Sequence, residues 1–140
     1  MIEPNSRLKA ARIRSGKTPA EIAALSGVEL ASYYDLENHP DELTSTISLR
    51  DLANLCRVLG IDTSSLVSNE SINKISLSDV STGIKNYLQA HSLSSSAFAD
   101  QVGYDIAPAL KTPGAILGWN LDGLRAVCTK IGINWLAAIP

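Results

Sequence analysis

Apolar side chains recur along this chain at the three- and four-residue spacing of amphipathic helices. The clearest stretch lies between Ser48 and Gly60, where the apolar positions are Leu49, Leu52, Leu55, Cys56 and Leu59. No run of four to eight residues alternates apolar and polar side chains convincingly, as a half-buried strand would. The pattern therefore predicts an all-α protein.

Capping residues and chain breakers set the expected helix boundaries in the first half. Thr18, Pro19 and Glu21 supply a helix cap, a first-turn proline and the third-position glutamate of a capping box. Gly27 then ends that short helix, and Pro40 disfavours a helical residue before it. The signals predict a first helix capped by residue 5 or 6 and ending near residue 15, further helices over 19–26, 30–38 and 49–59, a loop over 39–47 and a short turn over 63–67.

The second half of the chain echoes the first. Residues 48–62 and 120–134 both read as a cap, an apolar helix with one cysteine, and Gly-Ile. Cys56 and Cys128 are 72 residues apart, which is far too long for a solenoid repeat and indicates two copies of one small domain. We expect a domain over 1–67, a Ser/Asn-rich linker over 68–77 and a second domain over 78–140, with helices over 79–90 and 94–102 and a last helix capped by Asn120. Because such small domains have limited cores, the copies are expected to pack together.

The charges are unevenly placed. The net charge is −2, which is unfavourable for a nucleic-acid binder because Lys and Arg supply much of the affinity for phosphate. A basic stretch comes first, with Arg7, Lys9, Arg12, Arg14 and Lys17. An acidic stretch follows it, with Glu29, Asp35, Glu37, Asp41 and Glu42.

Several classes of protein find no support in the sequence. The two cysteines lie on apolar helix faces, which is typical of buried core thiols and not of a disulfide or metal site. No phosphate-binding loop, zinc-binding His pair or nucleophile motif occurs, so we expect no enzyme, no metal and no cofactor. The first residues lack a basic, then apolar leader, and no stretch approaches 18 apolar residues. We therefore expect a soluble cytoplasmic protein that contacts no membrane.

Residues 8–28, 32–38 and 52–61 together carry a resemblance to a known family. Residues 7–66 resemble the Cro/C1-type helix-turn-helix domain, also called the xenobiotic-response-element family, which has a five-helix fold like that of lambda repressor. Its centre is physically specific, because Ala23 lets two short helices cross closely and Gly27 allows a left-handed turn. The predicted fold is therefore two tandem five-helix units of this kind.

The resemblance implies that the third helix lies in the major groove while the start of the second helix faces the DNA backbone. The implied contact residues at the start of the second helix are Lys17 and Thr18. Those on or beside the third helix are Glu29, Leu30, Ser32, Tyr34, Asp35 and Asn38. The resemblance further implies that Arg12 and Glu37 form a structural ion pair and that Tyr33 faces the core.

The chain departs from the family where bases are read. Arg, Lys, Gln and Asn commonly contact base edges, whereas this third helix offers two carboxylates, a leucine and a tyrosine. In the second copy the positions equivalent to Arg12 and Glu37 are Leu88 and Pro113, and Pro108 interrupts the third helical segment. We interpret the second copy as a degenerate domain kept as scaffold or partner surface.

Two functions follow, from different classes. The resemblance predicts a DNA-binding transcriptional regulator that works as a homodimer or as an internal pseudo-dimer. The alternative is a protein-binding module, such as an antitoxin, immunity or adaptor protein, whose acidic third helix recognises a basic partner. Motif strength favours the regulator and charge placement favours the protein binder.

Overall fold

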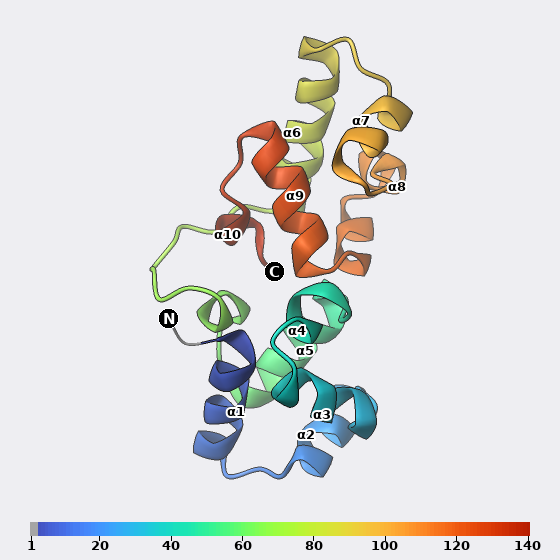
Figure 1. Cartoon of the computed structure of the whole chain (residues 1–140). Coiled ribbons are helices and arrows are strands. Elements are labelled where there is room, and N and C mark those ends of the chain that lie inside the picture. Colours follow the sequence, from blue (N-terminus) through green and yellow to red (C-terminus); the bar gives the residue numbers. More distant parts are fainter. Residues whose placement is uncertain (1–2) are drawn as a thin grey trace. The chain divides into compact units, whose positions relative to one another are not determined.

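The structure is a computed structural model that describes residues 3–140, and these residues form helices and no strands (Figure 1). The predicted all-α class is confirmed. The chain divides into two compact units, Met1–Ser71 and Ile72–Pro140, and each is described by itself. None of the helices within 3–140 is long and apolar enough to cross a membrane.

The described part of unit 1, residues 3–71, holds five α-helices and one 3₁₀ turn. The predicted loop over 39–47 is wrong in part, because it contains a single helical turn around the fully buried Leu43. The first helix also begins earlier than predicted, with Glu3 as its N-cap and Pro4 in its first turn. The elements are α1 (Pro4–Ser15), α2 (Pro19–Ser26), α3 (Leu30–Asn38), α4 (Glu42–Ser45), α5 (Leu49–Leu59) and η1 (Thr63–Leu66).

The core of unit 1 lies where α2 packs on α5 and α1 packs on α3. Each turn of α5 places a leucine or Cys56 in this core, as the apolar spacing predicts. The other helices also place fully buried side chains in this core, namely Ile22 of α2, Leu8 of α1 and Tyr33 of α3. Removing such side chains from water is the main force that holds these short helices together, since none would be stable alone.

Unit 2 repeats this order of elements. Its first helix is capped by Ser76 in a reciprocal capping box with Asp79, so it begins at Leu77, two residues before the predicted start at residue 79. A 3₁₀ segment precedes the helix capped by Asn120, and a short last helix follows that helix; the sequence pattern predicted neither. The elements are α6 (Leu77–Ala90), α7 (Ser95–Val102), α8 (Ala107–Lys111), η2 (Pro113–Gly118), α9 (Leu121–Ile131) and α10 (Trp135–Ala138).

The end of the predicted linker belongs to unit 2. The Ile75 amide donates a hydrogen bond to the Ala137 carbonyl at 3.0 Å, and the Lys74 ammonium donates to the Ile139 carbonyl at 3.1 Å. These bonds tie the chain before α6 to the α10 end of the same unit. The isolated apolar residues of this stretch therefore lie beside a packed domain.

The second helix of each unit begins and ends with the same kinds of residue. Thr18 and Ser94 cap α2 and α7, and Gly27 and Gly103 end them with φ of 80° and 82°. These positions differ by 76 residues, whereas the later pair of cysteines differs by 72. Unit 2 is therefore four residues shorter between these two positions. The same difference separates α3, with nine residues, from α8, with five. Unit 2 therefore lacks about one turn of its third helix.

Both cysteines lie in the cores, as predicted. Cys56 of α5 and Cys128 of α9 are free thiols with 1 % and 0 % of their surface exposed. Burial raises the pKa of each thiol to about 11, so little of either is the reactive thiolate at neutral pH.

The chain enters the left-handed region at or just after the end of the first helix of each unit, at the C-cap Gly16 with φ 74° and at Ser92, which follows the C-cap His91, with φ 51°. A Cβ atom disfavours this conformation. We expect Ser92→Gly to stabilise the protein by about 0.5 kcal/mol and Gly16→Ser to destabilise it by about 1 kcal/mol. Urea unfolding followed by circular dichroism measures both changes.

Gly114→Ser is the matched control for this exchange, because Gly114 has open space around it and no positive φ. We expect it to change the free energy of unfolding by less than about 0.5 kcal/mol. A Ser92→Gly variant less stable than the parent chain would contradict the assignment of strain to this turn.

Candidate macromolecule-binding surface

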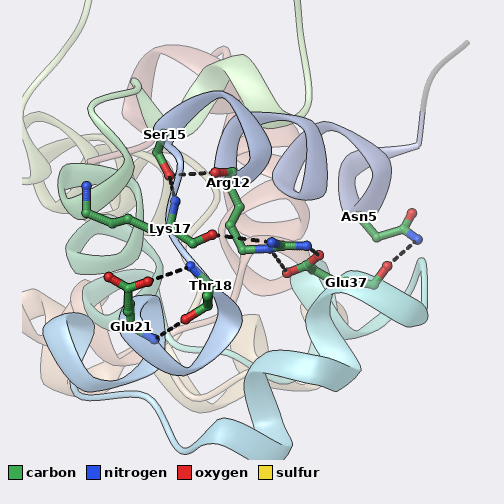
Figure 2. Close-up of polar contacts among 7 residues, drawn as sticks. All are labelled: Asn5, Arg12, Ser15, Lys17, Thr18, Glu21 and Glu37. Atoms are coloured by element: carbon green, nitrogen blue, oxygen red, sulfur yellow. Dashed lines mark hydrogen bonds and ion pairs between the residues drawn. The ribbon is translucent and has the colours of Figure 1, made fainter.

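The start of α2 is fixed by a capping box (Figure 2). The Glu21 amide donates to the Thr18 hydroxyl at 3.2 Å, and the Thr18 amide donates to the Glu21 carboxylate at 3.1 Å. The bond from the Thr18 amide is the first cause that lowers the pKa of Glu21 below its ordinary value. The Thr18 hydroxyl is exposed, but it already accepts a bond within the chain.

Gly27 turns the chain from α2 into α3. Its φ of 80° lies in the left-handed region, and its amide donates to the Ala23 carbonyl at 3.0 Å. Ile22 and Ala23 are buried on the inner side of α2, so α2 and α3 pack directly against each other. Together these features fix the direction in which α3 leaves the turn.

An ion pair ties the end of α3 to α1 (Figure 2). The Arg12 guanidinium donates to both oxygens of the Glu37 carboxylate, at 2.8 Å and 3.0 Å. A third bond runs from Arg12 to the Lys17 carbonyl at 3.3 Å, and Asn5 donates to the Glu37 carbonyl at 3.1 Å. Hydrogen bonding to Glu37 is the first cause that raises the pKa of Arg12. The implied pair is thus bidentate, a geometry that fixes orientation as well as charge.

Tyr33 lies beside this pair and faces the core. The residue is fully buried, and its hydroxyl makes no hydrogen bond within normal geometry. Burial first, and then the nearby Glu37 carboxylate, raise the pKa of Tyr33 well above its ordinary value. Its inward position agrees with the sequence interpretation and removes it from the candidate surface.

The outer side of α3 carries six predicted contact residues. The aromatic and apolar members are Leu30, 40 % exposed, and Tyr34, 46 % exposed. They are four residues apart and so lie next to each other on the helix surface. The polar members are also exposed, and they are Glu29, Ser32, Asp35 and Asn38. Lys17, before α2, is half-buried, whereas Thr18 is exposed.

An open, shallow hollow lies on one side of the start of α3. It has a volume of about 420 Å³, and it lies between α2 and α3. Apart from Glu29, the residues that line it have apolar side chains or are glycine, and the full set is Ala20, Ala23, Ala24, Gly27, Val28, Glu29 and Leu30.

A second hollow, which we call the acidic cleft, lies on the other side of α3. It has a volume of about 450 Å³ and an apolar floor that includes Val28, Leu36 and Ile47. Four carboxylates line it, from Glu29, Asp35, Glu42 and Asp51, and none of its lining residues in the described chain is basic. With one hollow on each side, the exposed side of α3 forms a ridge. We call it the α3 ridge, and it carries Leu30, Tyr34 and the polar residues Glu29, Ser32, Asp35 and Asn38.

Sequence reasoning placed Glu42 in the acidic stretch around the third helix, but it did not assign Asp51 to this surface. Glu42 reaches the cleft because the expected loop folds into α4, where the Thr46 hydroxyl donates to the Glu42 carboxylate at 2.8 Å. Asp51 lies in the first turn of α5, where a carboxylate is favoured by the helix dipole. The only signal in the sequence was the Ser48 cap, which places Asp51 three residues into a helix whose start faces the same cleft.

The charges of the acidic cleft suit a cationic group. A helix start normally attracts phosphate, but at α5 the Asp51 carboxylate is already there. The His39 ring lies 3.9 Å from the Asp35 carboxylate with both side chains mostly exposed, so this contact is weak. No group of three His, Cys, Asp or Glu side chains within residues 3–140 has metal-binding geometry.

Breaking the ion pair on one side only is expected to destabilise unit 1. Arg12→Met leaves the Glu37 carboxylate buried without its partner, at an expected loss of about 2–3 kcal/mol of unfolding free energy. The double variant Arg12→Met with Glu37→Met is expected to lose less than the single variant, because no charge is then stranded. Urea unfolding measures both.

Lys9→Met is the matched control on α1, where Lys9 is exposed, and we expect a change of less than about 0.5 kcal/mol. Additive losses in the double variant would show that Arg12 and Glu37 act independently.

The capping box predicts a pH effect. The pKa of Glu21 is lowered in the folded chain, so its contribution to stability is present above the unfolded pKa and is lost as the pH falls through the folded one. Carboxylate titration by NMR is expected to give a midpoint for Glu21 below its ordinary value. Thr18→Ala should move that midpoint upward, and an unchanged midpoint would contradict the role of the Thr18 cap.

Comparisons with known proteins add no assignment to this surface. No protein-family model, no curated protein and no solved structure matches the chain. The chemistry of the ridge and its two hollows is therefore what a functional proposal must explain.

Proposed function

We propose that the chain is a protein-binding module whose α3 ridge recognises a basic protein partner. Binding, and not catalysis, is the function that this surface supports. The observation that carries the proposal is the acidic cleft, where four carboxylates and no basic residue of the described chain line a hollow with an apolar floor. Arg or Lys side chains from a partner are the natural complement of such a hollow.

The ridge beside the cleft supplies the apolar part of the interface. Leu30 and Tyr34 are large, exposed and adjacent on α3, and aromatic and apolar anchors are typical of interface centres. The shallow hollow lined by Ala20, Ala24 and Leu30 gives room for an apolar side chain next to them. A partner helix with leucines on one face and arginines along its edge fits both hollows.

The proposal treats each unit as a Cro/C1-like helix-turn-helix domain. The supporting features are the short α2, the left-handed Gly27, the exposed α3 and the Arg12–Glu37 pair. Unit 2 has the same order of elements with a shorter third helix. The free, buried cysteines fit a reducing compartment, and we place the protein in the cytoplasm.

A DNA-binding transcriptional regulator is the second candidate. It is favoured by the placement of α2 and α3, which suits a helix entering the major groove, and by Lys17 and Thr18 near the start of α2. The carboxylates of Glu29 and Asp35 oppose it, because both lie exposed on the side that would face phosphates.

Binding of a designed peptide and of DNA by the full chain separates the two candidates. The probes are an amphipathic helical peptide with leucines on one face and flanking arginines, the same peptide with glutamates in place of arginines, and random duplex DNA at low salt. We expect the arginine peptide alone to bind. The double variant Glu29→Gln with Asp35→Asn should weaken that binding by about fivefold or more, since each exposed charge pair contributes up to about 1 kcal/mol.

Glu70→Gln is the control, because Glu70 is an exposed carboxylate of unit 1 that does not line the cleft. Tyr34→Ala tests the apolar part of the ridge and should weaken binding of the arginine peptide. Equal binding of both peptides, or equal effects of the Glu70 and cleft variants, would refute the proposal. DNA binding that falls steeply with salt would establish the regulator instead.

A further inference from the structure

A third hollow of unit 1 lies on a different face of α1 from the one that carries Arg12. It has a volume of about 330 Å³, within the range of small-molecule pockets. Its lining comes from α1, from the segment around η1 and from the residues that follow η1. The lining residues are Ser6, Arg7, Ala10, Arg14, Ile61, Ser65, Leu66 and Asn69.

One face of α1 forms a wall of this hollow. Arg7, Ala10 and Arg14 are three and four residues apart, so they share one helix face. Their helical rise places the two arginines about 10 Å apart along the axis, with a methyl group between them. Two long cationic side chains on either side of a small residue leave space for a ligand.

One arginine is held in place by the chain. The Arg7 guanidinium donates from a single nitrogen to the Ser65 carbonyl at 3.0 Å, and its other N–H groups are available for a second acceptor. Arg14 is exposed at the other end of the hollow. Among the described residues that line the hollow, none carries a carboxylate, so this pair of positive charges is not neutralised from within the hollow.

The rest of the hollow is apolar at its floor and polar at its rim. Ile61, Leu66 and Ala10 supply its apolar lining, and Leu66 is 1 % exposed. The Ser6 hydroxyl and the Asn69 amide are further possible hydrogen-bond donors around the opening. This combination suits a ligand with an anionic head and an apolar body.

We propose that this hollow, the arginine pocket, binds a small organic anion. The head is a phosphate or a carboxylate, held between Arg7 and Arg14, since a guanidinium matches both groups with paired N–H donors. The apolar body lies against Ile61 and Leu66. Such a ligand joins α1, η1 and Asn69, so it ties the chain that leaves unit 1 to the first helix of that unit.

Amide NMR titration of the full chain tests the pocket with phenyl phosphate, benzoate and inorganic phosphate. We expect phenyl phosphate or benzoate to give saturable shifts at Ala10, Ile61, Leu66 and Asn69, with the tighter of the two identifying the head group. Inorganic phosphate should bind more weakly than phenyl phosphate because it lacks the apolar body. Arg14→Gln should lower the affinity by about tenfold, the loss expected for one charge-assisted hydrogen bond.

Lys9→Gln is the matched control, because Lys9 is an exposed cation on α1 that does not line the pocket. It should leave the affinity unchanged, and both variants should keep the thermal unfolding midpoint of the parent chain. Equal losses in the two variants would indicate diffuse attraction between charges and overturn the proposal. Absence of saturable shifts with both organic anions would overturn it as well. Neither result depends on the α3 ridge, whose own test uses other residues and other probes.

Discussion

The orientation of α3 depends on one bidentate ion pair. Arg12 of α1 donates hydrogen bonds to both carboxylate oxygens of Glu37 near the end of α3. Gly27 fixes the other end of that helix through its left-handed turn. A helix of nine residues has little stability of its own, so it needs both attachments and the buried ring of Tyr33 to stay in place. These contacts use the inner side of α3. The residues on its outer side stay exposed and form the α3 ridge.

Much of this fold was accessible from the sequence because helix caps are local signals. Thr18, Ser48, Ser94 and Asn120 each accept a bond from the backbone three residues ahead, and this short-range chemistry is legible in the amino-acid order. The turn of α4 was missed because it depends on the burial of Leu43, where α4 packs against α3. Propensity alone does not predict such a tertiary effect.

The candidate surface was predictable in part for the same reason. The exposed positions of α3 follow from the helical period once Tyr33 and Leu36 are assigned to the core. The acidic cleft was not predictable, because it joins carboxylates from α3, α4 and α5 that only the tertiary fold brings together. The chemistry of this surface depends on the side chains that the fold leaves outside, because a fold does not by itself determine function.

The shortened third helix of unit 2 makes the two halves of the chain unequal. By the 76-residue offset, the positions of Asp35 and Glu37 are taken by Lys111, the last residue of α8, and by Pro113 beyond it, so α8 carries neither carboxylate. Under the proposed function, the two halves therefore do not form a bivalent clamp. The described residues of one chain present one such ridge, so tighter binding through avidity would require a second chain.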